Sequence, residues 1–333
     1  MATIYEIANE AGVSPSTVAR ALRGDGYCSQ EKREKILQIA QQLHYSPSHA
    51  ARTLKSNRTG KVLFCIPDIY NPFYFRMIRG VSDVLERYDY LPVLCHTKGL
   101  LANELKMLRN LQEGYGDGMV FVSFDFSQQN ISVVNGCSRP VVLTNNYQSP
   151  AGNDQFDCVY IDTYEGIRMA CTHFIEAGYT KLGYIGGNTA VQTGRERFAG
   201  FVRAMQEHDL PIDQAFLCEG DFSMESGEKA MTKLLQNKAL PEALVVANDL
   251  MAVGAHKVCK QHQLRVPQDI ALIGMDDSDL AGCLDISSIQ MKEEQLGRNA
   301  AELLMDRILN GAKEKRVVRI APELTLRGSS ERS

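Results

Sequence analysis

The side chains that could do covalent or metal chemistry are dispersed along this chain of 333 residues. Nine cysteines stand singly, several inside apolar runs such as Val62–Ile66, and no Cys-x-x-Cys pair suggests zinc or redox chemistry. The seven histidines include no pair at metal-ligand spacing. Residues 183–187 (GYIGG) lack the G-x-G-x-x-G spacing of a dinucleotide site, and neither a Walker motif nor G-x-S-x-G occurs. We therefore expect that the protein is not an enzyme and binds neither a metal nor a cofactor. We also expect that it is cytoplasmic and that its cysteines are reduced.

Charge is distributed unevenly between the two ends of the chain. Residues 1–60 carry eight Lys/Arg and five Asp/Glu, a balance of +3, and the other residues carry 28 and 35, a balance of −7, which sums to the net charge of −4. A small basic head on an acidic body suits a nucleic-acid anchor attached to a sensor domain. No run of about 20 apolar residues could span a bilayer, and no signal peptide precedes the first residues.

The elements that must position a nucleic-acid anchor are three short helices predicted within the first 45 residues. Thr3 and Glu6 form a capping box for the first helix, and Gly12 supplies the tight turn that ends it. Ser14 as N-cap and Pro15 at the first helical position begin the second helix, and Ser29 is expected to cap the third. Their buried faces are Ile4, Ile7, Ala8 and Ala11, then Val18, Ala21 and Leu22, then Ile36, Ile39, Ala40 and Leu43. Two such helices joined by a glycine turn predict a helix-turn-helix unit.

The remainder of the chain alternates short apolar runs with amphipathic helical stretches, which is typical of parallel α/β sheets. The predicted strands are 62–66, 91–95, 119–122, 141–143, 159–161, 182–185, 244–246 and 270–273. About 270 residues of this pattern are long for one sheet, so we predict two lobes with a change near Asp162. Residues 45–60 are flanked by loop formers and are too short for a stable isolated helix, so they read as a linker that could fold against a partner.

These segments together resemble the LacI/GalR family of transcription regulators. Residues 3–22 closely resemble its helix-turn-helix signature, and 45–60 resemble its hinge. Further family blocks follow in order at 71–74, 173–187, 195–201, 248–255 and 274–277. The resemblance implies an N-terminal all-α helix-turn-helix domain (1–46), a hinge helix or linker (47–60) and an effector-binding and dimerisation domain (61–330). That last domain would have the α/β fold of periplasmic binding proteins, two doubly wound parallel-sheet lobes, with later crossovers near 290 and 321.

The resemblance also assigns the DNA-binding residues. Pro15, Ser16 and Arg20 would face bases, since a guanidinium can pair bidentately with guanine, and Ser14 and Thr17 would contact phosphates. In the hinge, Leu54 would wedge open the central base step of the minor groove, with Ala51 and Lys55 also at the DNA. Ser48 stands where many members have Asn and can still cap the hinge helix.

For the ligand, family positions point to Phe73, Tyr74 and Phe222 as aromatic faces and to Arg197, Asn248 and Asp276 as polar contacts. Arg197 and Asp276 would be costly to bury unless paired with each other or with ligand. A sugar or sugar phosphate is our first expectation, and a nucleoside or purine corepressor is the alternative, which Val191 disfavours because the purine-binding member has an arginine there. Asn145 also stands where family members commonly have an aspartate, and Met291 stands where the lactose regulator of the family has a glutamine.

The resulting hypothesis is a homodimeric repressor that binds double-stranded, pseudo-palindromic operator DNA, with no membrane partner. It would control genes of sugar uptake or catabolism. The sequence shows no C-terminal leucine heptad, so we expect a dimer and not a tetramer. Two other classes would compete: an exported sugar-binding receptor with the same fold, and a Rossmann-type enzyme. Operator-specific binding would separate the first hypothesis from both.

Overall fold

The computed structural model describes residues 2–23, 27–45, 58–147 and 154–331. Contacts divide the chain into two units, Met1–Thr59 and Gly60–Ser333, and each is described by itself. The predicted loop at 24–26 and residues 46–57, which include most of the predicted hinge, lie outside the described residues.

The first unit is a three-helix domain built from α1 (Ile4–Ala11), α2 (Pro15–Arg23) and α3 (Gln30–Gln42). The predicted capping box is present, because Glu6 N–H donates to the Thr3 hydroxyl and Thr3 N–H to the Glu6 carboxylate, and Gly12 ends α1 at φ 68°. Residues of the three predicted faces pack into one apolar core. The predicted cap at Ser29 is wrong in one respect: Ser29 occupies the N-cap position, but its exposed hydroxyl makes no capping hydrogen bond.

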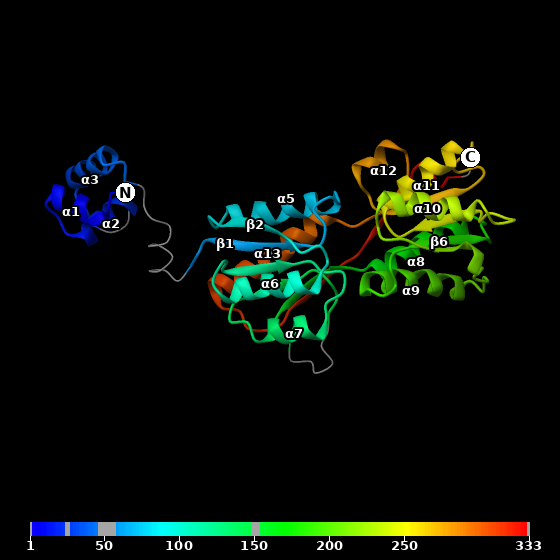
Figure 1. Ribbon diagram of the computed structural model, residues 1–333, viewed down its shortest axis with the longest axis horizontal. Coiled ribbons are helices and arrows are strands. Elements are labelled where there is room, and N and C mark those ends of the chain that lie inside the picture. Colours follow the sequence, from blue (N-terminus) through cyan, green and yellow to red (C-terminus); the bar gives the residue numbers. More distant parts are fainter. Residues whose placement is uncertain (1, 24–26, 46–57, 148–153, 332–333) are drawn as a thin grey trace. The chain divides into compact units, whose positions relative to one another are not determined.

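The second unit contains two six-stranded sheets, each the core of an α/β lobe (Figure 1). In the first lobe the strand order is β11-β5-β4-β3-β1-β2, and all neighbours are parallel. Its strands are β1 (Lys61–Ile66), β2 (Leu91–His96), β3 (Gly118–Phe121), β4 (Val141–Leu143), β5 (Asp157–Ile161) and β11 (Val317–Ile320). Helices α5 (Phe73–Glu86) and α13 (Glu293–Asn310) cover one face, and α6 (Leu101–Gln112) and α7 (Gln128–Asn135) cover the other.

The second lobe has the strand order β12-β10-β9-β8-β6-β7. Its strands are β6 (Leu182–Gly186), β7 (Leu217–Glu219), β8 (Ala243–Val246), β9 (Ala271–Asp276), β10 (Ser287–Gln290) and β12 (Glu323–Thr325). Helices α8 (Thr163–Glu176) and α9 (Gln192–Glu207) pack together, as do α10 (Met224–Leu234) and α11 (Asp249–Gln261), with α12 (Asp279–Cys283) beside α11 and the 3-10 turn η1 (Gln214–Phe216) before β7. The fold class is therefore confirmed, with one addition: β12 pairs antiparallel with β10.

The chain crosses between the lobes at three places. β5 belongs to the first sheet and α8 to the second lobe, β10 belongs to the second sheet and α13 packs on the first lobe, and β11 and β12 belong to different sheets. Helix α13 reaches the first lobe through a close approach to α5: a Cβ on Gly80 would lie 2.0 Å from the Glu294 carbonyl oxygen, and one on Gly297 would lie 2.2 Å from that of Met77. Only glycine fits at such backbone contacts.

Candidate functional site

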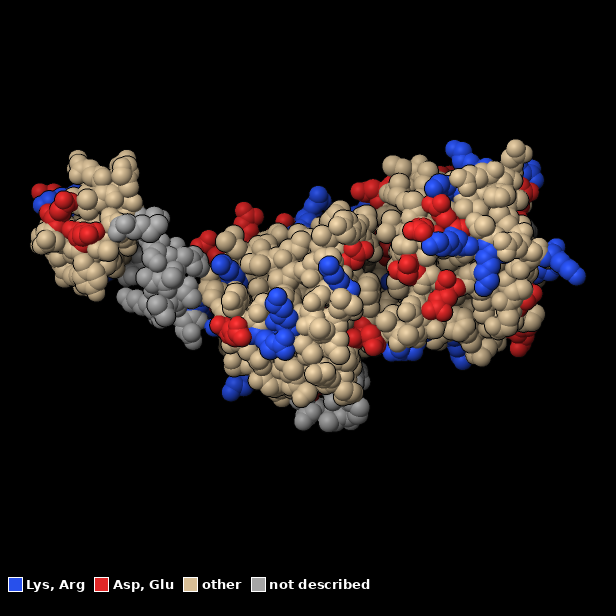
Figure 2. Space-filling model, viewed as in Figure 1, with Lys and Arg blue, Asp and Glu red and all other residues tan. Residues whose placement is uncertain are grey.

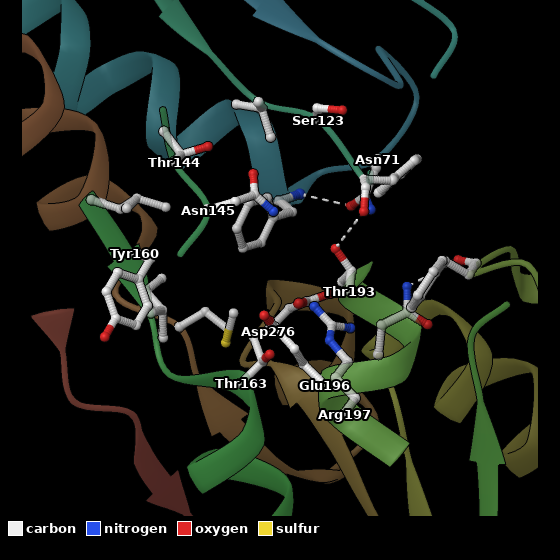
Figure 3. A pocket seen from close by; sticks show the side chains of 18 of the residues that line it. Asn71, Ser123, Thr144, Asn145, Tyr160, Thr163, Thr193, Glu196, Arg197 and Asp276 are labelled. Atoms are coloured by element: carbon white, nitrogen blue, oxygen red, sulfur yellow. Dashed lines mark hydrogen bonds between the residues drawn. The ribbon is translucent and has the colours of Figure 1, made fainter. Parts of the chain in front are cut away.

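A cavity lies between the two lobes at the carboxyl ends of their strands (Figure 3). Its walls enclose about 750 Å³, a volume that includes the open mouth. Asn71 follows β1, Ser123 follows β3 and Asn145 follows β4, while Asn248 follows β8 and Asp276 ends β9. Ligands of open parallel sheets bind at these strand ends, because the connecting loops converge there.

All six residues predicted for the ligand site line this one cavity: Phe73, Tyr74, Arg197, Phe222, Asn248 and Asp276. They come from α5 in the first lobe and from α9, the β9 end and two loops in the second, so residues up to about 200 positions apart meet at one place. Asn145 and Met291 line it as well.

The aromatic side chains form two groups. Phe73 and Tyr74 meet edge to face with ring centroids 5.2 Å apart, and Tyr74 is buried. Phe124 of the first lobe and Phe222 of the second stack at 5.9 Å with an interplanar angle of 16°. Phe222 has a left-handed backbone with φ 69°, and a Cβ on Gly187 would lie 2.0 Å from its ring. Glycine at position 187 therefore makes the space that the Phe222 ring occupies.

Arg197 brings a buried guanidinium to the cavity wall. Its Nη1 donates to the Ala247 carbonyl, and the guanidinium carbon lies 5.2 Å from the centroid of Phe222 in a cation–π contact. Its Nε is buried and has no hydrogen-bond partner among the described residues. A buried donor of this kind normally has a partner, so a ligand oxygen or a water is the natural acceptor.

Asp276 is the buried carboxylate beside Arg197 (Figure 3). Burial, reinforced by the negative charge of Asp249, holds the pKa of Asp276 well above its usual range, and Arg197 acts in the opposite direction. Its backbone has φ 123°, a region that L-residues rarely adopt. Such backbone strain costs on the order of 1–3 kcal/mol and is typical of ligand and active sites.

Asn248 has a largely structural role in this arrangement. Its Oδ1 accepts from Met251 N–H at 3.0 Å as the N-cap of α11, and its Nδ2 donates to the Phe222 carbonyl at 2.9 Å. The Asn248 side-chain amide thus holds the backbone of Phe222, whose ring stacks on Phe124.

Sequence reasoning missed most of the polar rim. The cavity also contains Ser123, Thr144, Asn146, Tyr160, Thr163, Thr193 and Glu196. The signal that could have found several of them is their position directly after a predicted strand. Glu196 gave no such signal, because it lies inside α9 next to Arg197; Gln192 Nε2 donates to its carboxylate at 2.7 Å, and burial raises its pKa.

Contacts between the lobes close both sides of the cavity. On one side Gln192 Nε2 donates to the Asn146 carbonyl at 3.0 Å, and Arg195 pairs with Asp125 at 3.2 Å. On the other side Arg76 of α5 donates to the Asp277 carbonyl at 2.9 Å and pairs with Asp279. These polar contacts cross the lobe boundary beside the Phe124–Phe222 stack, so all of them must break when the cavity opens.

In the first unit, the predicted DNA-contacting residues gather at the start of α2. The Ser14 hydroxyl accepts from Thr17 N–H at 3.2 Å and lies 2.8 Å from the Ser16 hydroxyl. Ser16 and Arg20 are exposed, one turn apart, and Arg20 Nε donates to the Ser16 carbonyl at 3.3 Å. Val18 and Ala21 are buried on the core side. Pro15 and Thr17 are half-buried. Ala51, Leu54 and Lys55 lie outside the described residues.

Comparison with known proteins identifies the family. Residues 3–48 match "Bacterial regulatory proteins, lacI family", and residues 171–330 match "Periplasmic binding protein-like domain". The chain is 32% identical to the HTH-type transcriptional repressor PurR of Aliivibrio salmonicida (strain LFI1238), over 99% of both chains.

Solved structures agree with this fold. The transcriptional regulator CelR–cellobiose complex is similar with a TM-score of 0.75 and 27% identity, covering 99% of this chain and 100% of that one. The lac repressor dimer bound to operator and the anti-inducer ONPF is similar with a TM-score of 0.86 and 21% identity, covering 99% of both.

The chain belongs to the LacI family of bacterial transcription regulators. It is a DNA-binding regulator with a periplasmic-binding-protein-like domain, and not an enzyme. Among the described residues, no helix is both long enough and apolar enough to cross a membrane.

Proposed function

We propose that this protein is a homodimeric repressor that binds a pseudo-palindromic operator and is switched by a sugar-like molecule in the interlobe cavity. The observation that carries the proposal is the convergence of Phe73, Tyr74, Arg197, Phe222 and Asp276 on one cavity whose walls come from both lobes. A ligand that contacts both walls binds the closed arrangement better than an open one, and that difference in affinity is what shifts a conformational equilibrium.

The chemistry of the cavity favours a neutral polyhydroxylated ligand. Phe222 offers a ring face for sugar C–H surfaces, Arg197 and Asp276 offer a donor and a carboxylate, and hydroxyls such as Thr193 stand around them. CelR, a relative of the same fold, is described with cellobiose. The alternative ligand, a nucleoside or purine, would need the Phe124 and Phe222 rings to separate, because centroids 5.9 Å apart leave no room for a flat base between them.

At the DNA end, the proposal assigns Arg20, Ser16 and Pro15 to base edges and Ser14 and Thr17 to phosphates. It is supported by the exposure of Ser16 and Arg20 on the side of α2 away from the buried Val18. Ala51, Leu54 and Lys55 complete it as the minor-groove contacts of the hinge. Ligand binding would change the spacing of the two heads of a dimer and thereby fold or melt the hinge pair.

Dimer formation is supported by apolar side chains at the edge of the first sheet. β2 is the outermost strand, and Leu91 and Leu94 on it are 62% and 50% exposed. Leu100 and Leu101 follow on α6 and the turn before it, and they are exposed too. Elsewhere on the viewed face, acidic and basic side chains are interspersed (Figure 2). An exposed apolar edge strand normally has a covering partner, and a second copy of the chain is the partner we propose.

Thermal unfolding against a panel of sugars, sugar phosphates, nucleosides and purines tests the ligand class. A ligand at a hundred times its dissociation constant adds about 2.7 kcal/mol of stability. We expect a saturable shift from a sugar that is lost in Asp276→Asn and retained in Asp213→Asn, a matched change on an exposed residue at η1. A shift from purines alone would replace the sugar with the alternative ligand. Sedimentation of the protein tests the dimer, and a tetrameric mass would contradict it.

A further inference from the structure

Cys65 and Cys95, which are 30 positions apart in sequence, lie opposite each other on neighbouring strands. They are register partners on the parallel strands β1 and β2, so both side chains project from the same face of the first sheet. Both pack into the apolar layer beneath α6 and α7. Adjacent strands are about 4.7–4.9 Å apart, which lies within the range of about 4.4–6.8 Å for Cα atoms joined by a disulfide.

The two thiols differ in exposure and in hydrogen bonding. Cys65 is fully buried on an inner strand, and Cys95 is half-buried on the outermost strand of the sheet. The Cys95 Sγ lies 3.5 Å from the Val93 carbonyl oxygen, and the two thiols also hydrogen-bond to each other.

The hydrogen bond between the thiols determines which one ionises first. It lowers the pKa of Cys95 against the effect of burial, and together with burial it raises the pKa of Cys65. The thiolate is the nucleophilic form of cysteine, so the Cys95 sulfur is the more reactive of the two. The buried partner is held directly beside it, where it can attack the oxidised sulfur.

We propose that Cys65 and Cys95 form an oxidisable dithiol, in which Cys95 reacts first with a hydroperoxide and Cys65 then closes an intramolecular disulfide. In the first step the Cys95 thiolate attacks one oxygen of hydrogen peroxide and becomes a sulfenic acid. The O–O bond breaks, and the other oxygen leaves as hydroxide, which takes up a proton to form water. In the second step the Cys65 sulfur attacks the Cys95 sulfur, the S–S bond forms, and a second water leaves with the Cys65 proton. Two thiols lose two electrons, and one peroxide is reduced to two waters.

The product would join the outermost strand of the first lobe to its neighbour covalently. The bond is between paired residues of one sheet, so it needs only a local adjustment of β1 and β2. Peroxide would form this disulfide and a thiol reductant would reduce it again, so the modification is reversible.

The test uses the full-length reduced protein, exposed to an equimolar amount of hydrogen peroxide. We expect two of the nine thiols to be lost and peptide mapping to show the 65–95 disulfide, which dithiothreitol reverses. Cys283, the exposed cysteine on α12, is the internal comparison. Oxidation of Cys283 ahead of Cys95, or disulfides between chains in place of the 65–95 bond, would overturn the proposal.

Variants separate the two steps. Cys95→Ser should abolish the disulfide and leave Cys65 reduced. Cys65→Ala should stop the reaction at a sulfenic acid on Cys95, which dimedone traps and mass spectrometry locates. Cys283→Ser should leave the 65–95 disulfide unchanged. If Cys65→Ala fails to fold, the order of the steps is still tested in the wild-type protein by trapping with dimedone at short times. Dimedone on Cys65 in place of Cys95 would contradict the assignment.

Discussion

Arg76 on α5 in the first lobe donates a hydrogen bond to the Asp277 carbonyl in the second lobe, with 2.9 Å between Nη1 and O. The same guanidinium pairs with Asp279. It is therefore one of the few side chains that hold the two lobes against each other on this side of the cavity.

Arg76→Ala should loosen the closed arrangement. A hydrogen bond of this kind contributes about 1 kcal/mol, so we expect the free energy of unfolding to fall by about that amount and the radius of gyration to increase. Arg79→Ala on the same helix is the control, because Arg79 is 72% exposed and its ion pair with Glu294 is long at 4.0 Å. Thermal unfolding and small-angle X-ray scattering measure the two quantities. Equal effects of both variants would mean that Arg76 does not hold the lobes.

Gly187→Ala should damage the ligand site without unfolding the protein. The new methyl group would lie 2.0 Å from the Phe222 ring, so the ring must leave its position beside Phe124 and Arg197. We expect loss of the stabilisation by the ligand that the panel identifies, with about 1–3 kcal/mol lower stability in its absence. Gly136→Ala is the matched control, because its nearest neighbour would be at an ordinary 3.5 Å. Full ligand response in Gly187→Ala would exclude Phe222 from the site.

Arg20→Ala should weaken operator binding by about 1–3 kcal/mol, the contribution of one bidentate base contact, and relax the preference at that base pair. Arg33→Ala removes the same charge from an exposed position on α3, so it controls for the general electrostatic contribution. Fluorescence anisotropy with operator and scrambled duplexes gives both affinities. If the two variants lose the same affinity on both duplexes, Arg20 contacts phosphate and not a base.

Glu293 should make stability depend on pH between about 4.5 and 7. Burial, together with the charges of Asp277 and Asp249, raises the pKa of this carboxyl to about 7, while Arg76 and a backbone hydrogen bond act against it. The folded state therefore holds its proton more tightly than the unfolded state, so the stability contribution is complete below the unfolded pKa and is lost as pH rises through 7.

The measurement is the difference in unfolding free energy between wild type and Glu293→Gln across this pH range. We expect the wild type to lose up to about 3 kcal/mol relative to the variant between the two pH limits. Glu302→Gln on the same helix, at an exposed position, is the matched control for the loss of one carboxyl group. A flat curve for Glu293→Gln would show that this carboxyl titrates normally.

Each of the eight predicted apolar runs overlaps a strand, although residues 122 and 270 lie just outside β3 and β9. Seven of these strands are largely buried, and buried parallel strands need continuous apolar residues; the exception is the exposed edge strand β2. The strands that this reasoning missed are short or rich in polar residues: β7, β10, β11 and β12. In β10, Ser287 and Ser288 are fully buried, and their hydroxyls donate to the Arg327 carbonyl at 2.9 Å and to Asp249 at 2.6 Å. A buried serine is acceptable only with such partners, and these lie about 40 positions away in sequence, so no local pattern shows them.

The candidate site shows the same limit. The resemblance to the family predicted Arg197, Asn248 and Asp276 as polar contacts to the ligand. Only the fold shows that the Asn248 side chain is instead bonded to the Met251 N–H and the Phe222 carbonyl. Glu196 and the register pair Cys65 and Cys95 could not be recognised, because spacing along the chain does not reveal which side chains meet across a sheet or a lobe boundary.

The three crossings between the lobes also govern how such proteins can be recombined. β11 lies in the first sheet and β12 in the second, with only Ala321 and Pro322 between them, and α13 on the first lobe follows a strand of the second. A gene fusion with one junction near Asp162 would deprive the first lobe of α13 and β11. Exchange of a sensor lobe between two regulators therefore needs three matched junctions. Grafting a new specificity is easier by changing the loops that follow the strands than by exchanging a contiguous half of the chain.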